Sequence, residues 1–180
     1  MSHIAVIGGS GFASLPGMEF LGEACPETPY GQPSAPIQRG RLAGGDFLFL
    51  SRHGLQHRIP PHAVNYRANI YALKTLGVER VISVSACGSL REALAPGHIV
   101  IPDQLVDWTR DNRGRTFFGE GLVAHISAAD PFCPHLSAAL AGAVEACGGT
   151  VHRGGTFLTS EGPRFATRAE SALYRSWGFD

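Results

Sequence analysis

The chain has 180 residues, enough for one domain with its own hydrophobic core, and its 15 basic residues balance 15 acidic ones. Nucleic-acid and anionic-membrane surfaces need an excess of positive charge, so this balance argues against both as partners. Hydrophobic residues make up 44% of the chain, which favours a folded globular protein over a disordered one. The sequence also contains no apolar run of the roughly 18 residues that a membrane span needs.

The first half of the chain predicts strands around one helix. Residues 3–8 form an apolar run that ends in glycine, which predicts a buried strand. Residues 37–42 and 46–51 flank Ala43-Gly44-Gly45 and predict a β-hairpin. A helix is expected to follow the prolines at 60 and 61, with Gly77 at its end. Its apolar positions recur at helical spacing and are Ala63, Tyr66, Ile70 and Leu73.

The second half continues the alternation of strands and helices. Extended segments are expected at 80–85, 99–101, 104–108 and 156–159, and helices at 134–147 and 167–177, with a long loop over 110–130. This alternation predicts an α/β fold with a mixed, largely parallel central sheet flanked by helices. A single domain over residues 1–180 is expected, because no linker or repeat divides the chain.

Polar clusters follow three of the predicted strands, where ligands of open α/β sheets bind. The first, Gly8-Gly9-Ser10-Gly11, offers backbone amides and a hydroxyl to an anion, and the alternative is an ordinary turn. The second, Arg52-His53-Gly54, offers a guanidinium and an imidazole to an oxyanion, and the alternative is a surface pair at a turn. The third, Ser85-Ala86-Cys87-Gly88-Ser89, adds small residues and hydroxyl groups, with Cys87 interpreted as a packed thiol rather than a nucleophile.

A fourth segment could hold a flat ligand. Gly162-Pro163 fixes a turn shortly before Phe165, whose ring could stack on a heterocycle or pack in the core. Together with a phosphate cradle, such an aromatic surface predicts a reaction between phosphate and a nucleoside.

Metal and disulfide chemistry are not expected. His53, His57 and His62 are close in sequence, but Gly54 and the two prolines break any helix that would align them. The four cysteines show no zinc-like spacing, which indicates packed thiols in a reduced, cytoplasmic compartment. They are Cys25, Cys87, Cys133 and Cys147.

Beyond these patterns, the chain resembles the 5′-methylthioadenosine phosphorylase branch of the trimeric purine nucleoside phosphorylase family. The stretches that carry the resemblance are IGGSGF (7–12), ETPYGQPS (27–34), SRHGLQHRIPPHAVNYRANIYALK (51–74), SACGSLREALAPGHIVIPDQLVDWT (85–109), AHISAADPFCP (124–134) and TSEGPRFATRAESALYRSWG (159–178). The resemblance implies phosphorolysis of 5′-methylthioadenosine to adenine and 5-methylthioribose 1-phosphate, in purine and methionine salvage. Inorganic phosphate is then the co-substrate, and no other cofactor is expected.

The resemblance also implies roles for individual residues. Five are expected to hold the phosphate, namely Ser10, Arg52, His53, Ser85 and Ala86. Phe165 is expected to lie against the purine. His125 is expected to reach the pocket for the 5′ group in a neighbouring subunit, which implies a homotrimer.

The chain matches only the N-terminal two-thirds of the family sequence, so we expect it to lack the C-terminal part that carries the ribose- and purine-binding segments. Two alternatives therefore stay open. One is a related enzyme that cleaves methylthioinosine or ordinary purine nucleosides. The other is a catalytically incomplete fragment that binds phosphate or a nucleoside.

Overall fold

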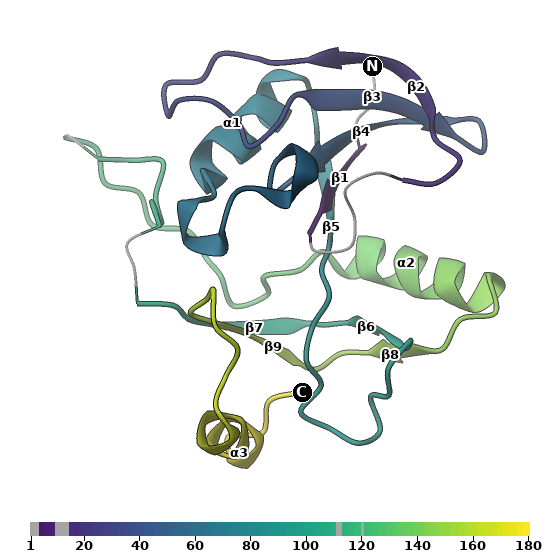
Figure 1. Ribbon diagram of the computed structural model, residues 1–180, viewed down its shortest axis with the longest axis vertical. Helices are drawn as coiled ribbons and strands as arrows, with labels where there is room; N and C mark the ends of the chain where they lie inside the picture. The colour runs from purple at the N-terminus through teal and green to yellow at the C-terminus, as the bar shows by residue number, and fades with distance from the viewer. Residues whose placement is uncertain (1–3, 10–14, 111–112, 120) are drawn as a thin grey trace. The chain divides into compact units, whose positions relative to one another are not determined.

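The computed structural model describes residues 4–9, 15–110, 113–119 and 121–180, and the chain divides into two compact units (Figure 1). The first unit comprises residues 1–87 and 112–122, and the second comprises residues 88–111 and 123–180. This division does not test the single domain expected over 1–180, which stays a prediction.

The first unit is built on a five-stranded sheet with the strand order β2-β3-β4-β1-β5. Its strands are β1 (Ile4–Gly8), β2 (Glu19–Ala24), β3 (Ile37–Leu42), β4 (Gly45–Ser51) and β5 (Arg80–Val84). Strands β4, β1 and β5 pair in parallel, whereas β2, β3 and β4 pair antiparallel. The predicted α/β fold with a mixed sheet is confirmed.

The predicted hairpin is present as β3 and β4. Leu42 pairs with Gly45, which leaves Ala43 and Gly44 as a two-residue turn with φ angles of 49° and 81°. Positive φ at both positions matches the twist of the flanking strands. Strand β2 was not predicted, because Gly22 and a register shift after Phe20 interrupt its alternating pattern.

The predicted helix begins later than expected. Helix α1 (Tyr66–Thr75) is preceded by two short 3₁₀ turns, η1 (Leu55–His57) and η2 (Pro61–Ala63). The expectation that Ala63 belongs to the helix is therefore wrong. The physical reason is Asn65, whose side chain accepts a hydrogen bond from the amide of Ala68 at 3.1 Å and so caps the helix at that point.

The core of the first unit lies between α1 and one face of the sheet. Ala5 pairs with Leu48 and Ile7 with Leu50, so all four side chains share a face. Leu73 of α1 belongs to the same buried cluster. Burial of these apolar side chains fixes the register of β1 and β4.

The second unit contains two pairs of parallel strands and two helices. Its elements are β6 (Ile99–Ile101), β7 (Gln104–Trp108), α2 (Pro134–Ala146), β8 (Val151–Arg153), β9 (Thr156–Ser160) and α3 (Arg168–Ser176). Strand β6 pairs with β8, and β7 with β9. Strand β8 was not predicted, because two of its three residues, His152 and Arg153, are polar and no apolar run marks it. The described residues of 110–130 form neither helix nor strand, as predicted.

The four cysteines are free but exposed, so the expectation of packed thiols is wrong. None lies inside a helix or strand, and Cys133 and Cys147 stand at the two ends of α2. Among the residues that the structure describes, no helix has the length and apolar character needed to cross a bilayer.

Leu50 tests this placement of the core. Its side chain is fully buried in β4, so Leu50→Ala should lower the free energy of unfolding by about 2–5 kcal/mol. Leu42→Ala is the matched control in β3, where the side chain is 44% exposed, and it should cost less than about 1 kcal/mol. Denaturant unfolding of the three proteins compares the losses. Equal losses of unfolding free energy in the two variants would contradict this placement of the core.

Candidate functional site

The first residues of three predicted clusters meet at one edge of the sheet in the first unit. Gly8 of β1 pairs with Ser51 of β4 and with Val84 of β5, so the next residue of each strand emerges at the same edge. The amide of Arg52 donates to the Gly8 carbonyl, and the amide of Gly9 donates to the Val84 carbonyl, both at 2.9 Å.

The Arg52 guanidinium connects the strand ends. Its Nη1 donates to Ser85 Oγ at 3.1 Å, and its Nε donates to His53 Nε2 at 3.4 Å. Gly9 leaves room for this group, because a Cβ there would lie 2.5 Å from Arg52 Nη2. The cluster thus offers a half-buried cation beside a hydroxyl group, an arrangement suited to an oxyanion.

His53 is held rigidly next to this cation. Its side chain is 4% exposed, and Nδ1 lies 2.8 Å from the carbonyl oxygen of Ile59. Burial lowers the pKa of His53 and outweighs the hydrogen bond with Ile59, which raises it. Nearby Arg52 and His57 lower the pKa further, so the ring is neutral at pH 7.

A tight loop produces this geometry. Gly54 has a φ of 75°, and its amide and carbonyl both bond to Ser51, whose hydroxyl donates at 3.0 Å. A Cβ at Gly54 would lie 3.1 Å from the Ser34 carbonyl oxygen. Gln56 and His57 also take positive φ angles, which brings Ile59 back to His53.

The remaining residues of the predicted phosphate group are less defined. Ser10 lies outside the described residues, and Ala86 is exposed directly after Ser85. Desolvation raises the pKa of the Cys87 thiol, and Arg52 opposes this effect only in part. A protonated thiol disfavours the nucleophilic role for Cys87. The phosphate-binding roles themselves stay predictions.

Phe165 and His125 belong to the second unit. Phe165 follows β9, and its ring is 95% exposed, so the alternative of a core residue is wrong. His125 is exposed in a segment without regular structure. Their predicted contacts, with a purine and with a neighbouring subunit, stay predictions.

The segment around Phe165 is anchored by an ion pair. Arg164 contacts both carboxylate oxygens of Glu170 at 2.7 Å, while Glu170 and Thr167 form a capping box at the start of α3. The Arg164 guanidinium lowers the pKa of Glu170 to about 2, so the carboxylate is charged at neutral pH. These contacts tie Arg164 to the start of α3.

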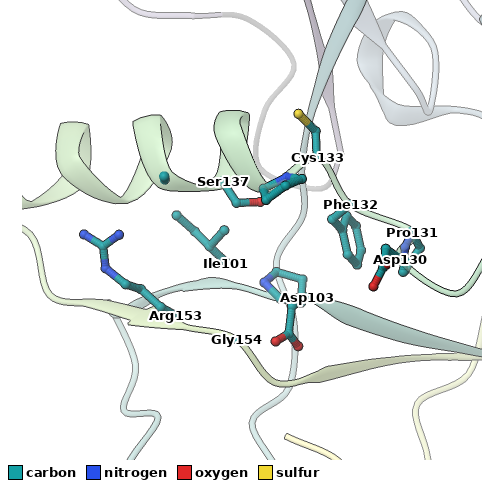
Figure 2. Close-up of a pocket in the computed structure, with 12 residues that line it drawn as sticks. Ile101, Asp103, Asp130, Pro131, Phe132, Cys133, Ser137, Arg153 and Gly154 are labelled. Atoms are coloured by element: carbon teal, nitrogen blue, oxygen red, sulfur yellow. The ribbon is translucent and has the colours of Figure 1, made fainter.

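The second unit also has an open pocket of about 700 Å³ beside the start of α2 (Figure 2). Two of its polar side chains already have partners. Arg153 pairs with Glu145 at 2.9 Å, and Asp103 accepts from the Gly155 amide at 3.1 Å. None of the predicted site residues lines it. Within the described part of the chain, no group of three or more His, Cys, Asp or Glu side chains could hold a metal ion.

Two features of the cluster of Arg52, His53 and Ser85 were not predicted. The close approach of Arg52 to Gly9 could have been suspected from a glycine directly after a strand. The contact from Ile59 to His53 has no sequence signal, because a backbone carbonyl makes it and a left-handed loop brings it there.

Gly9→Ala tests the geometry of the cluster. The added methyl group would meet Arg52 Nη2 at 2.5 Å and the Val84 carbonyl at 2.9 Å, so the guanidinium must move. Displacing one charge-assisted hydrogen bond should weaken the binding of inorganic phosphate about tenfold or more. Gly88→Ala is the matched control, since its Cβ meets no atom within 4 Å. Calorimetric titration with phosphate measures both, and unchanged affinity in Gly9→Ala would contradict the geometry.

Comparison with known proteins places this geometry in a family. Residues 3–180 match the phosphorylase superfamily. S-methyl-5'-thioadenosine phosphorylase from Geobacter sulfurreducens is 57% identical over 97% of this chain, and the enzyme from Koribacter versatilis is 50% identical over 99%. The chain spans about three-fifths of the length of these relatives, 61% of each.

Solved structures agree with the sequence comparison. A methylthioadenosine phosphorylase from an antarctic soil metagenomic library superposes with a TM-score of 0.92 at 49% identity, over 99% of this chain and 63% of that one. Methylthioadenosine phosphorylase from Schistosoma mansoni gives 0.93 at 35% identity, over 100% and 71%. The expected nucleoside-phosphorylase fold is confirmed. Because its sequence matches the family over residues 3–180, almost its whole length, the chain belongs to the phosphorylase superfamily.

Proposed function

We propose that the protein cleaves the N-glycosidic bond of 5′-methylthioadenosine with inorganic phosphate, releasing adenine and 5-methylthioribose 1-phosphate. The observation that carries the proposal is the cluster of Arg52, His53 and Ser85 at the strand edge. It occurs in a chain 57% identical to a protein named for this activity.

The proposed reaction is a displacement at the anomeric carbon of the ribose. A phosphate oxygen forms the new bond to this carbon as the bond to the purine nitrogen breaks. The electron pair of the broken bond leaves with the base, which then takes up a proton. Positive charge develops on the sugar during this step, and a phosphate held on the correct side stabilises it.

Arg52 supplies the main binding energy for phosphate in this proposal. A guanidinium forks onto two oxygens, and each charge-assisted hydrogen bond contributes about 1.5–3 kcal/mol. Ser85 already contacts the guanidinium at 3.1 Å and offers a hydroxyl donor. Ser10 and the Ala86 amide would complete the cradle.

The other proposed roles lie in the second unit. Phe165 would stack on the purine through its exposed ring, and His125 would serve the 5′ pocket of a neighbouring subunit in a homotrimer. The enzyme would work in the cytoplasm, in purine and methionine salvage, with no cofactor beyond its phosphate co-substrate.

The test is release of adenine from 5′-methylthioadenosine by the purified chain, with and without phosphate. Phosphate-dependent release of adenine with 5-methylthioribose 1-phosphate is expected. Arg52→Ala should lower kcat/KM for phosphate at least about 10- to 100-fold, since one to two charge-assisted bonds are lost. Arg39→Ala is the matched control on strand β3, where the side chain is exposed, and should change little.

Each other outcome has a defined meaning. Faster phosphorolysis of methylthioinosine or of ordinary purine nucleosides would assign a different substrate within the family. Phosphate binding without turnover would identify a catalytically incomplete fragment. Adenine release that does not depend on phosphate would contradict the proposed reaction.

A further inference from the structure

The two nitrogens of the His53 ring lie in different surroundings. Nδ1 is 2.8 Å from the carbonyl oxygen of Ile59, and the Ile59 amide donates back to the His53 carbonyl at 2.9 Å. A carbonyl oxygen can only accept a hydrogen bond, so Nδ1 carries the proton.

Nε2 of His53 is therefore an acceptor in the neutral ring. The Nε–H of Arg52 donates to it at 3.4 Å, which independently places a lone pair on this atom. The titratable and charged side chains that act on the ring are Arg52 and His57, whose ring centre lies 4.4 Å away. Both disfavour a second proton on the buried ring, as does its desolvation.

An anion that binds beside Arg52 would thus face the donors of the guanidinium and one acceptor, Nε2 of His53. An oxyanion without a proton has only lone pairs, and two acceptors facing each other leave both unsatisfied. Hydrogen phosphate has a hydroxyl group that can donate to Nε2. The Nε–H of Arg52 is then released to donate to another phosphate oxygen.

We propose that His53 selects protonated oxyanions, binding hydrogen phosphate through a P–O–H group that donates to its Nε2, and disfavours unprotonated tetrahedral anions such as sulfate. The inference rests on the proposed function, since it assumes that this cluster holds phosphate. The proton balance differs between the two anions. Hydrogen phosphate brings its own proton, whereas sulfate needs one proton from solvent to convert Nε2 into a donor.

Calorimetric titration of the full chain tests this balance. Phosphate, arsenate and sulfate are titrated at about pH 6.5, 7.5 and 8.5, in two buffers of different ionisation enthalpy, which gives the number of protons exchanged. Phosphate and its protonated analogue arsenate should bind as dianions without proton uptake at about pH 8.5. Binding of sulfate should be accompanied by the uptake of one proton at His53 Nε2. The affinity for sulfate should therefore fall about tenfold per pH unit over the upper part of this range.

His53→Gln provides the matched variant. The glutamine amide can present a donor to any oxyanion at every pH. Sulfate binding by this variant should lose its pH dependence, and the preference for phosphate over sulfate should narrow at least tenfold at about pH 8.5. His62→Gln, at an exposed histidine in η2, should behave as the unmodified chain does.

The outcomes separate this inference from the proposed function. Sulfate binding without proton uptake and with constant affinity would overturn the role of His53 while leaving the phosphate site intact. Binding of neither anion would overturn both. If phosphate, arsenate and sulfate bind as expected but no adenine is released, only the proposed reaction is contradicted. If His53→Gln does not fold, the number of protons that the unmodified chain takes up with each anion still tests the role of His53.

Discussion

Two backbone hydrogen bonds continue the parallel ladder of β4, β1 and β5 one residue beyond the strands themselves. They join Arg52 to Gly8 and Gly9 to Val84, each at 2.9 Å. Because a buried face fixes the register of β1 and β4, the position of Arg52 follows from packing far from the cluster, while Ser85 is placed by the pairing of β5 with β1. The positions of Arg52 and Ser85 therefore depend on the sheet, whereas the orientation of His53 depends on the loop that follows β4.

The same edge imposes a strict steric requirement. Gly9 has no space for a side chain, since Arg52 and the Val84 carbonyl already occupy it. His53 is oriented by a backbone carbonyl, and the loop that supplies this carbonyl needs left-handed residues at 54, 56 and 57. The small residue at Gly9 and the turn after His53 thus serve one purpose, which is to hold the Arg52 and His53 side chains in fixed directions.

The sequence predicted those elements whose cause is local. The hairpin follows from Ala43-Gly44, and the strand ends follow from apolar runs that stop at small residues. The start of α1 was misplaced because Pro61–Ala63 forms a separate 3₁₀ turn instead of the first turn of the helix. Asn65 caps the helix while its own Nδ2 donates to the Tyr30 carbonyl at 2.6 Å, a contact across 35 residues. The orientation of His53 could likewise not be predicted from the sequence, because a backbone carbonyl, that of Ile59, sets it.

In the second unit, the segment that carries Phe165 is held at both ends while its ring is left uncovered. The Arg110 amide donates to Glu161 at 2.8 Å on one side, and the capping box of Thr167 and Glu170 begins α3 on the other. A ring that is 95% exposed gains nothing from core packing, yet the backbone beneath it is fixed. Anchoring the segment that carries an aromatic ring before a ligand arrives lowers the entropy lost on binding. This combination is the one that a stacking surface for a flat base requires, which supports Phe165 as the base-binding residue of the proposed reaction.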